Sequence, residues 1–551
     1  MATFTTPGAP ALGASPAQPT SAGPSPEPGA PVTGGGANAA PGGEAAGSEL
    51  PLGDPALQGS APSAGLPLPS PLPRSTPEAE GLSSAGLLAL VSALDGGAGE
   101  IHSLMLLRHG KVVAEGWWAP YAPEDMHVMY SVTKSFNSTA VGFAVEEGLL
   151  SVDDLLVPHF ADLAPAQVDP ELAAMKVRDL LTMNTGHQSD SIDAMRQRTD
   201  GQWTRSFLEG DVPLTPGTYF FYNSGAAYML GALVQRVTGM TVEEYLRPRL
   251  FEPLGITREI WGQSEERVNL TDGGLSVRTE DLAKFGQLYL QGGMWNGTQL
   301  LPAGWAADAT AMQVPSVNSG TIEVNNNWGY GYGYQFWRSQ VGYRADGSLG
   351  QFAFVLPEQD IVLAITSGTS DTNGVMNLVW QNLLPAIVGD PQPEDAAALA
   401  ALRERLAGLG LSMPAGEPSA LAADVSGRRY AMAQNALGVS AVTLDFAGAS
   451  PSLAIEDADG LHTLTVGSGQ WARQRTGYRK HINELFDTPE QGVAVSGAWS
   501  ADNTFVARIV FNETPYTMTT TFAFEGEQVR VNSTYNVRWG TPSDPEMTGT
   551  R

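Results

Sequence analysis

The chain of 551 residues contains no cysteine, and this absence excludes disulfides, thiolate metal sites and a cysteine nucleophile together. Histidine is scarce as well, with seven residues in the whole chain. No two of them have the H-x-H or H-E-x-x-H spacing of zinc hydrolases, so we do not expect a zinc enzyme.

Basic residues are few: 30 Lys and Arg stand against 58 Asp and Glu, which gives a formal net charge of −28. So acidic a chain argues against nucleic acid or an anionic membrane surface as partner. Long apolar runs are missing too, so no transmembrane segment is predicted. Met1–Pro10 has neither a basic start nor an apolar stretch, so no signal peptide is visible and the localisation stays unknown.

Composition divides the chain into four predicted parts. Residues 1–74 are almost entirely Pro, Gly, Ala, Ser and Thr, and we expect disorder because such a segment buries too little apolar surface to offset its ordering entropy. A tail of this kind is compatible with an extracytoplasmic or envelope location. We expect a main globular domain over 75–390, a helical connector over 391–420 and an all-β accessory domain over 421–551.

Apolar periodicity in residues 75–390 predicts one α/β (α+β) domain. Strand patterns lie at 101–107, 112–118, 351–356 and 361–367, and helical patterns at 87–94, 131–147, 177–181, 226–237, 242–247 and 280–291. Because strands near both ends enclose an inserted helical section, we expect one α/β sheet with a mostly helical partner.

In the C-terminal part the helical periodicity of apolar residues gives way to strand-like alternation. Alternation of apolar and polar residues at 441–446, 453–455, 504–511, 516–524 and 528–535 predicts an antiparallel sandwich or barrel of roughly eight strands. It contains no group of residues typical of a catalytic site.

Ser131 and Lys134 have S-x-x-K spacing at the start of a predicted helix. Residues three apart share a helix face, so the hydroxyl and the amine would lie side by side. A lysine in a low-dielectric site loses proton affinity, and its neutral amine can then deprotonate the serine. The alternative is a solvated surface lysine. Only one of the five lysines follows a serine at this spacing, and the apolar neighbours of Lys134 favour a buried helix.

An aromatic segment that ends at a polar bend supplies a third candidate. In Pro216–Gly225, Tyr222 stands just before the helix predicted at 226–237, where its hydroxyl can relay a proton between nucleophile and leaving group. Most aromatics of this run are equally typical of a core. No G-x-S-x-G elbow occurs, so an α/β-hydrolase mechanism lacks its usual nucleophile.

Five motifs in order resemble the β-lactamase-related serine hydrolases: class C β-lactamases, penicillin-binding proteins, D-alanyl-D-alanine carboxypeptidases, family VIII carboxylesterases and 6-aminohexanoate-dimer hydrolases. They are Tyr130-Ser-Val-Thr-Lys-Ser135, Asp179-Leu-Leu-Thr-Met-Asn-Thr-Gly186, Pro216-Gly through Tyr222-Asn-Ser224, Phe285-Gly-Gln-Leu-Tyr-Leu290, and Gly347-Ser-Leu-Gly-Gln351 with Leu356-Pro-Glu358. The resemblance covers residues 76–389. It implies a serine β-lactamase/DD-peptidase-like α/β (α+β) domain with an antiparallel sheet and a helical subdomain. It also implies an acyl-enzyme on Ser131, with Lys134 as base and Tyr222 as acid/base, and no cofactor or metal.

The resemblance also suggests substrate-binding residues and shows two departures. The usual Tyr-x-Asn is Tyr-Asn-Ser here, so Ser224 stands where the family offers an amide. The usual Lys-Thr-Gly is absent, and Arg344 is a candidate replacement for its cation. An oxyanion N–H is expected near Ala345, while Gln351 and His187 are candidate lining residues.

These departures favour a small-molecule ester or amide as substrate over β-lactam turnover. The first alternative is a D-alanyl-D-alanine carboxypeptidase or β-lactamase acting on cell-wall-like substrates. A second is a non-catalytic ligand binder or sensor that keeps only the fold. A third places the function in the C-terminal β-domain, as a lipid or glycan binder. Nothing in the sequence indicates the oligomeric state.

Overall fold

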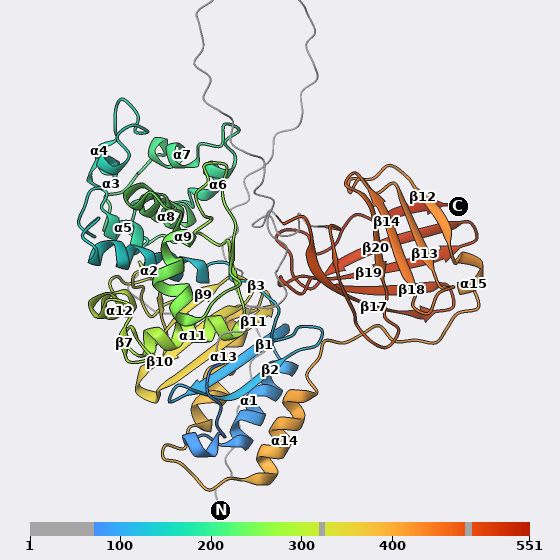
Figure 1. Cartoon of the computed structure of the whole chain (residues 1–551). Helices are drawn as coiled ribbons and strands as arrows, with labels where there is room; N and C mark the ends of the chain where they lie inside the picture. The colour runs from blue at the N-terminus through green and yellow to red at the C-terminus, as the bar shows by residue number, and fades with distance from the viewer. Residues whose placement is uncertain (1–70, 319–325, 480–487) are drawn as a thin grey trace, which may run out of the picture. The chain divides into compact units, whose positions relative to one another are not determined.

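The computed structural model describes residues 71–318, 326–479 and 488–551, so most of the tail predicted over 1–74 lies outside the described residues. Figure 1 shows a part rich in helices around one sheet, followed along the chain by a part made almost entirely of strands. No helix within these described ranges is long and apolar enough to cross a bilayer.

The first sheet has six antiparallel strands in the order β2-β1-β11-β10-β9-β8. Its strands are β1 (Glu100–Arg108), β2 (Lys111–Trp117), β8 (Trp337–Arg338), β9 (Tyr343–Gly347), β10 (Gln351–Leu356) and β11 (Ile361–Gly368). The N-terminal β1 pairs along its length with β11, from Glu100 opposite Gly368 to Arg108 opposite Ile361. The four strands predicted for this domain are confirmed, and the chain does return to the sheet after the helical section.

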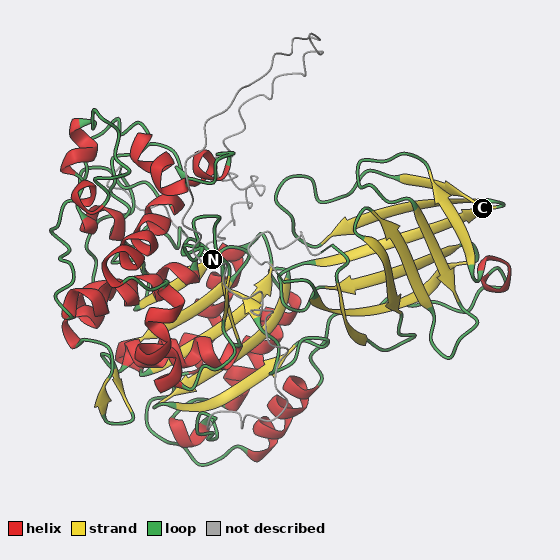
Figure 2. Ribbon diagram, turned by 45° about the horizontal axis from the view of Figure 1, so that its top comes forward, coloured by secondary structure: helices red, strands yellow, loops and turns green. Residues whose placement is uncertain are grey.

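Successive side chains of β1 point to opposite faces of the sheet and enter two different cores. Leu104 and Leu106 pack in the core that includes α1 (Ser84–Gly96), α13 (Thr372–Leu383) and α14 (Ala396–Ala407). Met105 and Leu107 pack in the core of the helical region on the other face. In Figure 2 red helices accordingly cover both faces of this yellow sheet.

The helical region supplies the second layer. Its helices are α2 (Val132–Glu146), α3 (Leu156–His159), α4 (Pro170–Ala174), α5 (Val177–Leu181), α6 (Ile192–Arg196), α7 (Trp203–Glu209), α8 (Ser224–Thr238), α9 (Val242–Leu246), α10 (Glu252–Leu254), α11 (Thr279–Leu290) and α12 (Ala303–Thr310). Three short strands, β3 (His127–Val128), β4 (Ile260–Trp261) and β5 (Leu275–Val277), form a small sheet, and β6 (Met294–Trp295) and β7 (Thr298–Gln299) form a hairpin. Helix α2 is buried from Val132 to Ala144, including the polar residues Lys134 and Asn137, so the prediction of a buried helix is confirmed.

The C-terminal part is a nearly closed barrel of ten strands, preceded by α15 (Ala422–Val425). Its strands are β12 (Arg428–Met432), β13 (Ala441–Asp445), β14 (Ser452–Asp457), β15 (Gly460–Thr465), β16 (Ala472–Thr476), β17 (Gln491–Ala501), β18 (Thr504–Val510), β19 (Thr517–Glu525), β20 (Gln528–Tyr535) and β21 (Met547–Thr550). Of the sandwich and the barrel that the pattern allowed, the barrel is confirmed, with more strands than the roughly eight expected.

Side chains fill the interior of this barrel. Val442, Phe522 and Val531 belong to a cluster in which every buried member is at most 9% exposed. The cavity between them measures about 10 Å³, room for one water molecule at most. A lipid or glycan does not fit in that cavity, so the structure gives no support to the idea of a ligand-carrying barrel.

Candidate active site

Ser131 stands at the first turn of α2, directly after a sharp bend in the chain. The bend is made by Tyr130, whose φ of 44° lies in the left-handed region that few residues other than glycine adopt. Backbone bonds hold it in place: the Met129 N–H donates to Leu275 of β5 at 2.8 Å, and the Val132 N–H donates to Met129 at 3.2 Å. The half-buried Ser131 is therefore presented by a rigid turn on a buried helix.

Lys134 lies beside this serine. Its Nζ donates to Ser131 Oγ at 2.9 Å and to the backbone carbonyl of Asp272 at 2.5 Å. The side chain is 1% exposed, and burial lowers its pKa to about 8, although the charges of Asp272 and Asp190 oppose this shift. With that pKa roughly a tenth of the amine is neutral at pH 7, which is enough for a general base.

The carboxylate of Asp272 does not neutralise the lysine directly. It binds Arg196 at 2.7 Å, and only its backbone oxygen accepts from Lys134. An amine bound through a carbonyl rather than a carboxylate loses its proton more readily, because the charged form gains less from the contact.

Tyr222 completes the group that the sequence predicted. The ring centroid lies 5.1 Å from Lys134 Nζ, and the ring stacks on Trp337 with centroids 5.6 Å apart. Burial raises the pKa of Tyr222 well above its ordinary value, while a side-chain hydrogen bond with Ser131 opposes the shift. The phenol is therefore protonated at neutral pH and close enough to exchange a proton with the serine oxygen.

The residues after Tyr222 build the start of α8. The side-chain oxygen of Asn223 accepts from Gly225 N–H at 3.0 Å and from the Ser191 hydroxyl at 2.8 Å, so this amide is a helix cap. Ser224 is half-buried in the first turn, and its backbone N–H donates to Asp190 at 2.8 Å. Sequence reasoning gave Asn223 no role, although Asn before a helix is a common capping signal.

The turn between β9 and β10 lies against the segment that carries Ser131. A Cβ on Gly347 would stand 2.3 Å from the carbonyl oxygen of Met129 and 3.3 Å from the amide nitrogen of Val132, so only glycine fits here. The sequence predicted an oxyanion N–H near Ala345. That residue pairs with Ala353 inside the sheet and lies two residues before Gly347. The sequence signal for Gly347 was its place at the start of the fifth motif.

Gln351 braces that turn instead of facing solvent. The side chain is fully buried, its amide donates to the carbonyl of Ser367 at 2.8 Å, and its oxygen accepts from the Ser367 N–H at 3.2 Å. These contacts tie the end of the turn to β11. The structure therefore gives this candidate lining residue a supporting position.

Arg344 has its charge compensated inside the protein. The side chain is fully buried. Its guanidinium donates to the carboxylate of Asp346 at 2.8 Å and to the Ser339 hydroxyl at 2.9 Å. Burial raises the pKa of Asp346, and the guanidinium beside it opposes that shift. The candidate cation is thus engaged by a carboxylate on its own strand.

His187 is 5% exposed and packs against Phe207, with ring centroids 5.1 Å apart. Its Nδ1 lies 2.9 Å from the Thr185 hydroxyl, and burial lowers the pKa of the imidazole to about 4. The ring is neutral at physiological pH, and among the described residues it makes no hydrogen bond to the Ser131 group.

The barrel also contacts the segment that carries Ser131, and nothing in the sequence pointed to this contact. The described residues fall within one contact unit, Pro67–Arg551. The Tyr130 hydroxyl donates to the Tyr516 hydroxyl at 3.0 Å, and the Val128 N–H donates to the carbonyl of Glu513 at 3.0 Å. Leu349, in the β9–β10 turn, packs within the barrel core. The C-terminal part thus supports both segments that flank Ser131.

In the described part of the chain no three His, Asp or Glu side chains converge as a metal site needs. The family model named Beta-lactamase matches residues 95–386. The chain belongs to the β-lactamase family, whose members are serine hydrolases.

Individual relatives are more distant. A 6-aminohexanoate-dimer hydrolase from Paenarthrobacter ureafaciens is 28% identical over 38% of this chain and 57% of that protein. Penicillin-binding protein 4 from Amycolatopsis lactamdurans is 25% identical over 56% of this chain and 91% of that protein. The octameric penicillin-binding protein homologue from Pyrococcus abyssi superposes with a TM-score of 0.42 at 19% identity, over 84% of this chain and 98% of that one.

Proposed function

We propose that this protein hydrolyses small ester or amide substrates through an acyl-enzyme on Ser131. The observation that carries the proposal is the 2.9 Å hydrogen bond between Lys134 Nζ and Ser131 Oγ, made by a buried amine whose pKa is about 8. A buried amine near neutrality beside a serine hydroxyl is suited to activate a nucleophile.

The chemistry runs in two halves. Neutral Lys134 takes the proton of Ser131 as Oγ attacks the substrate carbonyl, and a tetrahedral oxyanion forms. Tyr222 gives its proton to the leaving alcohol or amine as the old bond breaks, and regains one from Lys134. Water then attacks the acyl carbonyl and gives a proton to neutral Lys134. The bond between Ser131 Oγ and the acyl carbon breaks, Oγ takes that proton back, and the acid is released with Ser131 and Lys134 restored.

Two backbone N–H groups would hold the oxyanion. One is that of Ser131, at the start of α2, where unpaired N–H groups favour negative charge. The second, by our proposal, is that of Ser348, because Gly347 brings this end of the β9–β10 turn against Met129 and Val132. This places the second donor three residues after Ala345, the residue near which the sequence predicted it.

The substrate class follows from the charges near the site. A β-lactam or a peptide with a free carboxylate calls for a cation, and the guanidinium of Arg344 is already engaged by Asp346. We propose an accessory role for the barrel, which supports the site from outside.

The test compares wild type, Ser131→Ala and Ser138→Ala on short-chain p-nitrophenyl esters, p-nitroanilides and a β-lactam. Ser138 is a matched control because it lies on the same helix, is fully buried, and has no hydrogen-bond partner among the described residues. We expect turnover by wild type and Ser138→Ala, and a loss of about 10³-fold or more in Ser131→Ala. Acylation by the β-lactam without ester turnover would favour the cell-wall alternative, and no reaction with any of the three would favour the non-catalytic binder.

A further inference from the structure

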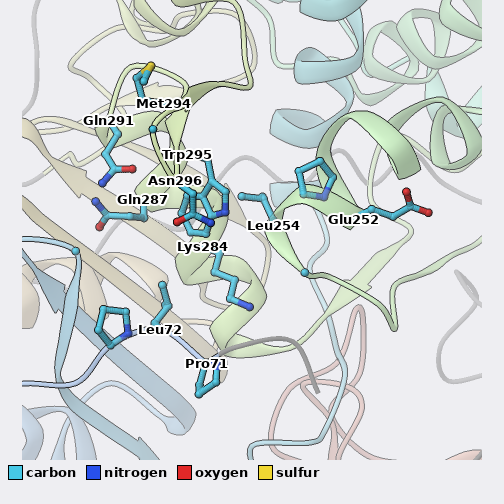
Figure 3. A pocket seen from close by; sticks show the side chains of 15 residues that line it. Pro71, Leu72, Glu252, Leu254, Lys284, Gln287, Gln291, Met294, Trp295 and Asn296 are labelled. Carbon is cyan, nitrogen blue, oxygen red and sulfur yellow. The ribbon is translucent and has the colours of Figure 1, made fainter. Parts of the chain in front are cut away.

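Among the described residues two lysines are almost completely buried, and they differ in what surrounds the amine. Lys284 of α11 is 2% exposed and lines a cavity of about 760 Å³, and none of the residues that line it takes part in the proposed reaction. Figure 3 shows this side chain extending from α11 into the space between Leu72 and the turn that carries Leu254. Lys134 instead meets a serine hydroxyl and the backbone carbonyl of Asp272. What sets Lys134 apart is therefore that carbonyl and the groups that hold it in place.

The carbonyl belongs to a tight turn just before β5. The Gly274 N–H donates to the carbonyl of Leu270 at 2.7 Å, so Asp272 stands in the middle of the turn. The carboxylate of this residue is 6% exposed, and its Oδ2 lies 2.7 Å from the guanidinium of Arg196. Its Oδ1 has no hydrogen-bond partner in the described part of the chain. A buried carboxylate needs a compensating charge, and here Arg196 supplies it.

Arg196 reaches this carboxylate from the surface. It is the last residue of α6, its side chain is 38% exposed, and its guanidinium carbon lies 6.0 Å from the ring centroid of Trp203. The start of α6 is fixed beside Tyr222, because the side-chain oxygen of the next residue, Asn223, accepts from the Ser191 N–H at 3.1 Å. Arg196 is thus held near the site, and none of its hydrogen bonds to described residues goes to the reacting atoms.

Three charged side chains from different segments lie near enough to change the pKa of Lys134. Burial has the largest effect and lowers this pKa to about 8; the charges of Asp272 and Asp190 oppose the shift, and that of Arg196 adds to it. Asp190 is engaged by two backbone N–H groups, at the starts of α6 and α8. The phenol ring of Tyr222 faces the amine as well, with its centroid 5.1 Å away. Of the two carboxylates, Asp272 is the one whose charge depends on another side chain.

We propose that Arg196 is a positioning residue for the hydrolysis: it holds the carboxylate of Asp272 so that this residue presents only its backbone carbonyl to Lys134. Without the guanidinium, the buried carboxylate has the lysine as its nearby cation. A carboxylate beside an amine favours the protonated form, which cannot accept the proton of the serine. The inference rests on the proposed function, because it assigns a regulator to the same base.

The experiment measures kcat/KM for p-nitrophenyl butyrate from pH 6 to 10, corrected at each pH for spontaneous hydrolysis. The variants are Arg196→Met, Arg196→Lys, Asp272→Asn, and the double variant of Arg196→Met with Asp272→Asn. Arg198→Met is the matched control, because this arginine lies two residues further on and pairs with Asp200 at 2.6 Å and Glu209 at 2.7 Å. Thermal unfolding establishes that each variant is folded.

We expect the rate to rise with a midpoint near pH 8 in wild type, Arg196→Lys and Arg198→Met. In Arg196→Met the midpoint should move up by about one pH unit, so the rate at pH 7 falls about tenfold while the rate at pH 10 changes little. Asp272→Asn should move the midpoint to lower pH. The double variant should return toward wild type, because the charge that Arg196 compensates is gone.

Equal midpoints in wild type and Arg196→Met would overturn the inference, as would a loss in Arg196→Met that is the same at every pH or that persists in the double variant. If Arg196→Met does not fold, an unmoved midpoint in Asp272→Asn would count against the inference in the same way. Ester turnover that persists in Ser131→Ala would contradict the proposed function instead, so the two failures are distinguishable.

Discussion

The interior around α2 and the interior of the barrel are built from different kinds of side chain. Beneath α2 the structure buries Lys134, Asn137 and the carboxylate of Asp272, each at most 6% exposed. The barrel core is mainly aliphatic and aromatic, with a hydroxyl pair at its centre, Thr520 and Ser533, that satisfies itself at 2.9 Å. The barrel also buries an ion pair, Arg479 with Asp544 at 2.8 Å, but both charges are compensated there. The amine of Lys134 has only a hydroxyl and a carbonyl as direct hydrogen-bond partners among the described residues, so the interior around α2 is the better candidate for chemistry.

The largest effect on activity is expected from a substitution that leaves no neutral amine beside Ser131. Lys134→Arg keeps a positive charge and a long side chain, but guanidinium does not lose its proton in proteins. We expect a loss of about 10³-fold in kcat for ester hydrolysis, within the usual range for a lost general base. The exposed Lys176→Arg, measured beside it, should retain full activity.

The same lysine predicts the pH dependence of the wild type. Below the pKa of about 8 the amine is protonated and cannot accept the proton of Ser131, and above it the amine is neutral. The rate should therefore rise with pH and level off above pH 8. A profile that stays flat from pH 6 to 9 would show that Lys134 is not the titrating base.

A smaller effect is expected for the proton donor. Tyr222→Phe keeps the stack on Trp337 but removes the hydroxyl. We expect kcat to fall by about 10²-fold on p-nitroanilides and by less on p-nitrophenyl esters. The reason is that p-nitrophenolate leaves without a proton, whereas the anilide nitrogen must be protonated before it leaves. Tyr219→Phe, in the same aromatic run, is the control. Equal losses on both substrates would remove Tyr222 from the role of acid.

The smallest effect tests the contribution of the barrel. Tyr516→Phe removes the hydroxyl that accepts from Tyr130, the residue before Ser131. If this contact positions Ser131, kcat should fall by about threefold to tenfold with KM unchanged. Tyr535→Phe is the control, because that hydroxyl bonds Asp544 at 3.3 Å within the barrel. A Tyr516→Phe variant whose only change is a lower melting temperature would assign the contact to stability alone.

The sequence predicted this fold well where periodicity is local. The helix at 177–181 and the strand at 351–356 have the predicted bounds. The strand is a nearly continuous apolar run that is buried throughout and ends just before Pro357, so its limits can be read from its own residues. Ser131 and Lys134 could be paired from spacing alone, since one helix turn sets their distance. The role of Gly347 depends on a close approach between segments far apart in sequence, which no local pattern encodes.

Which groups a side chain contacts in the folded protein was harder to predict than which segment carries it. Arg344 was a reasonable candidate cation, but whether Asp346 engages it depends on which face of β9 both side chains share and what covers them. The contact between Tyr130 and Tyr516 joins residues nearly four hundred positions apart, and only the folded chain reveals it. Spacing therefore found the proposed reacting pair, and tertiary structure was needed to find the residues that support it.

The central claim is that Ser131 is a nucleophile activated by a buried amine. The most direct measurement is the intact mass of wild type, Ser131→Ala and Ser138→Ala after reaction with a serine-directed phosphonate, followed by peptide mapping. We expect one phosphonyl adduct on Ser131 in wild type and in Ser138→Ala, formed faster as pH rises through about 8, and none in Ser131→Ala. An adduct on another residue, or equal labelling of Ser131→Ala, would contradict the account.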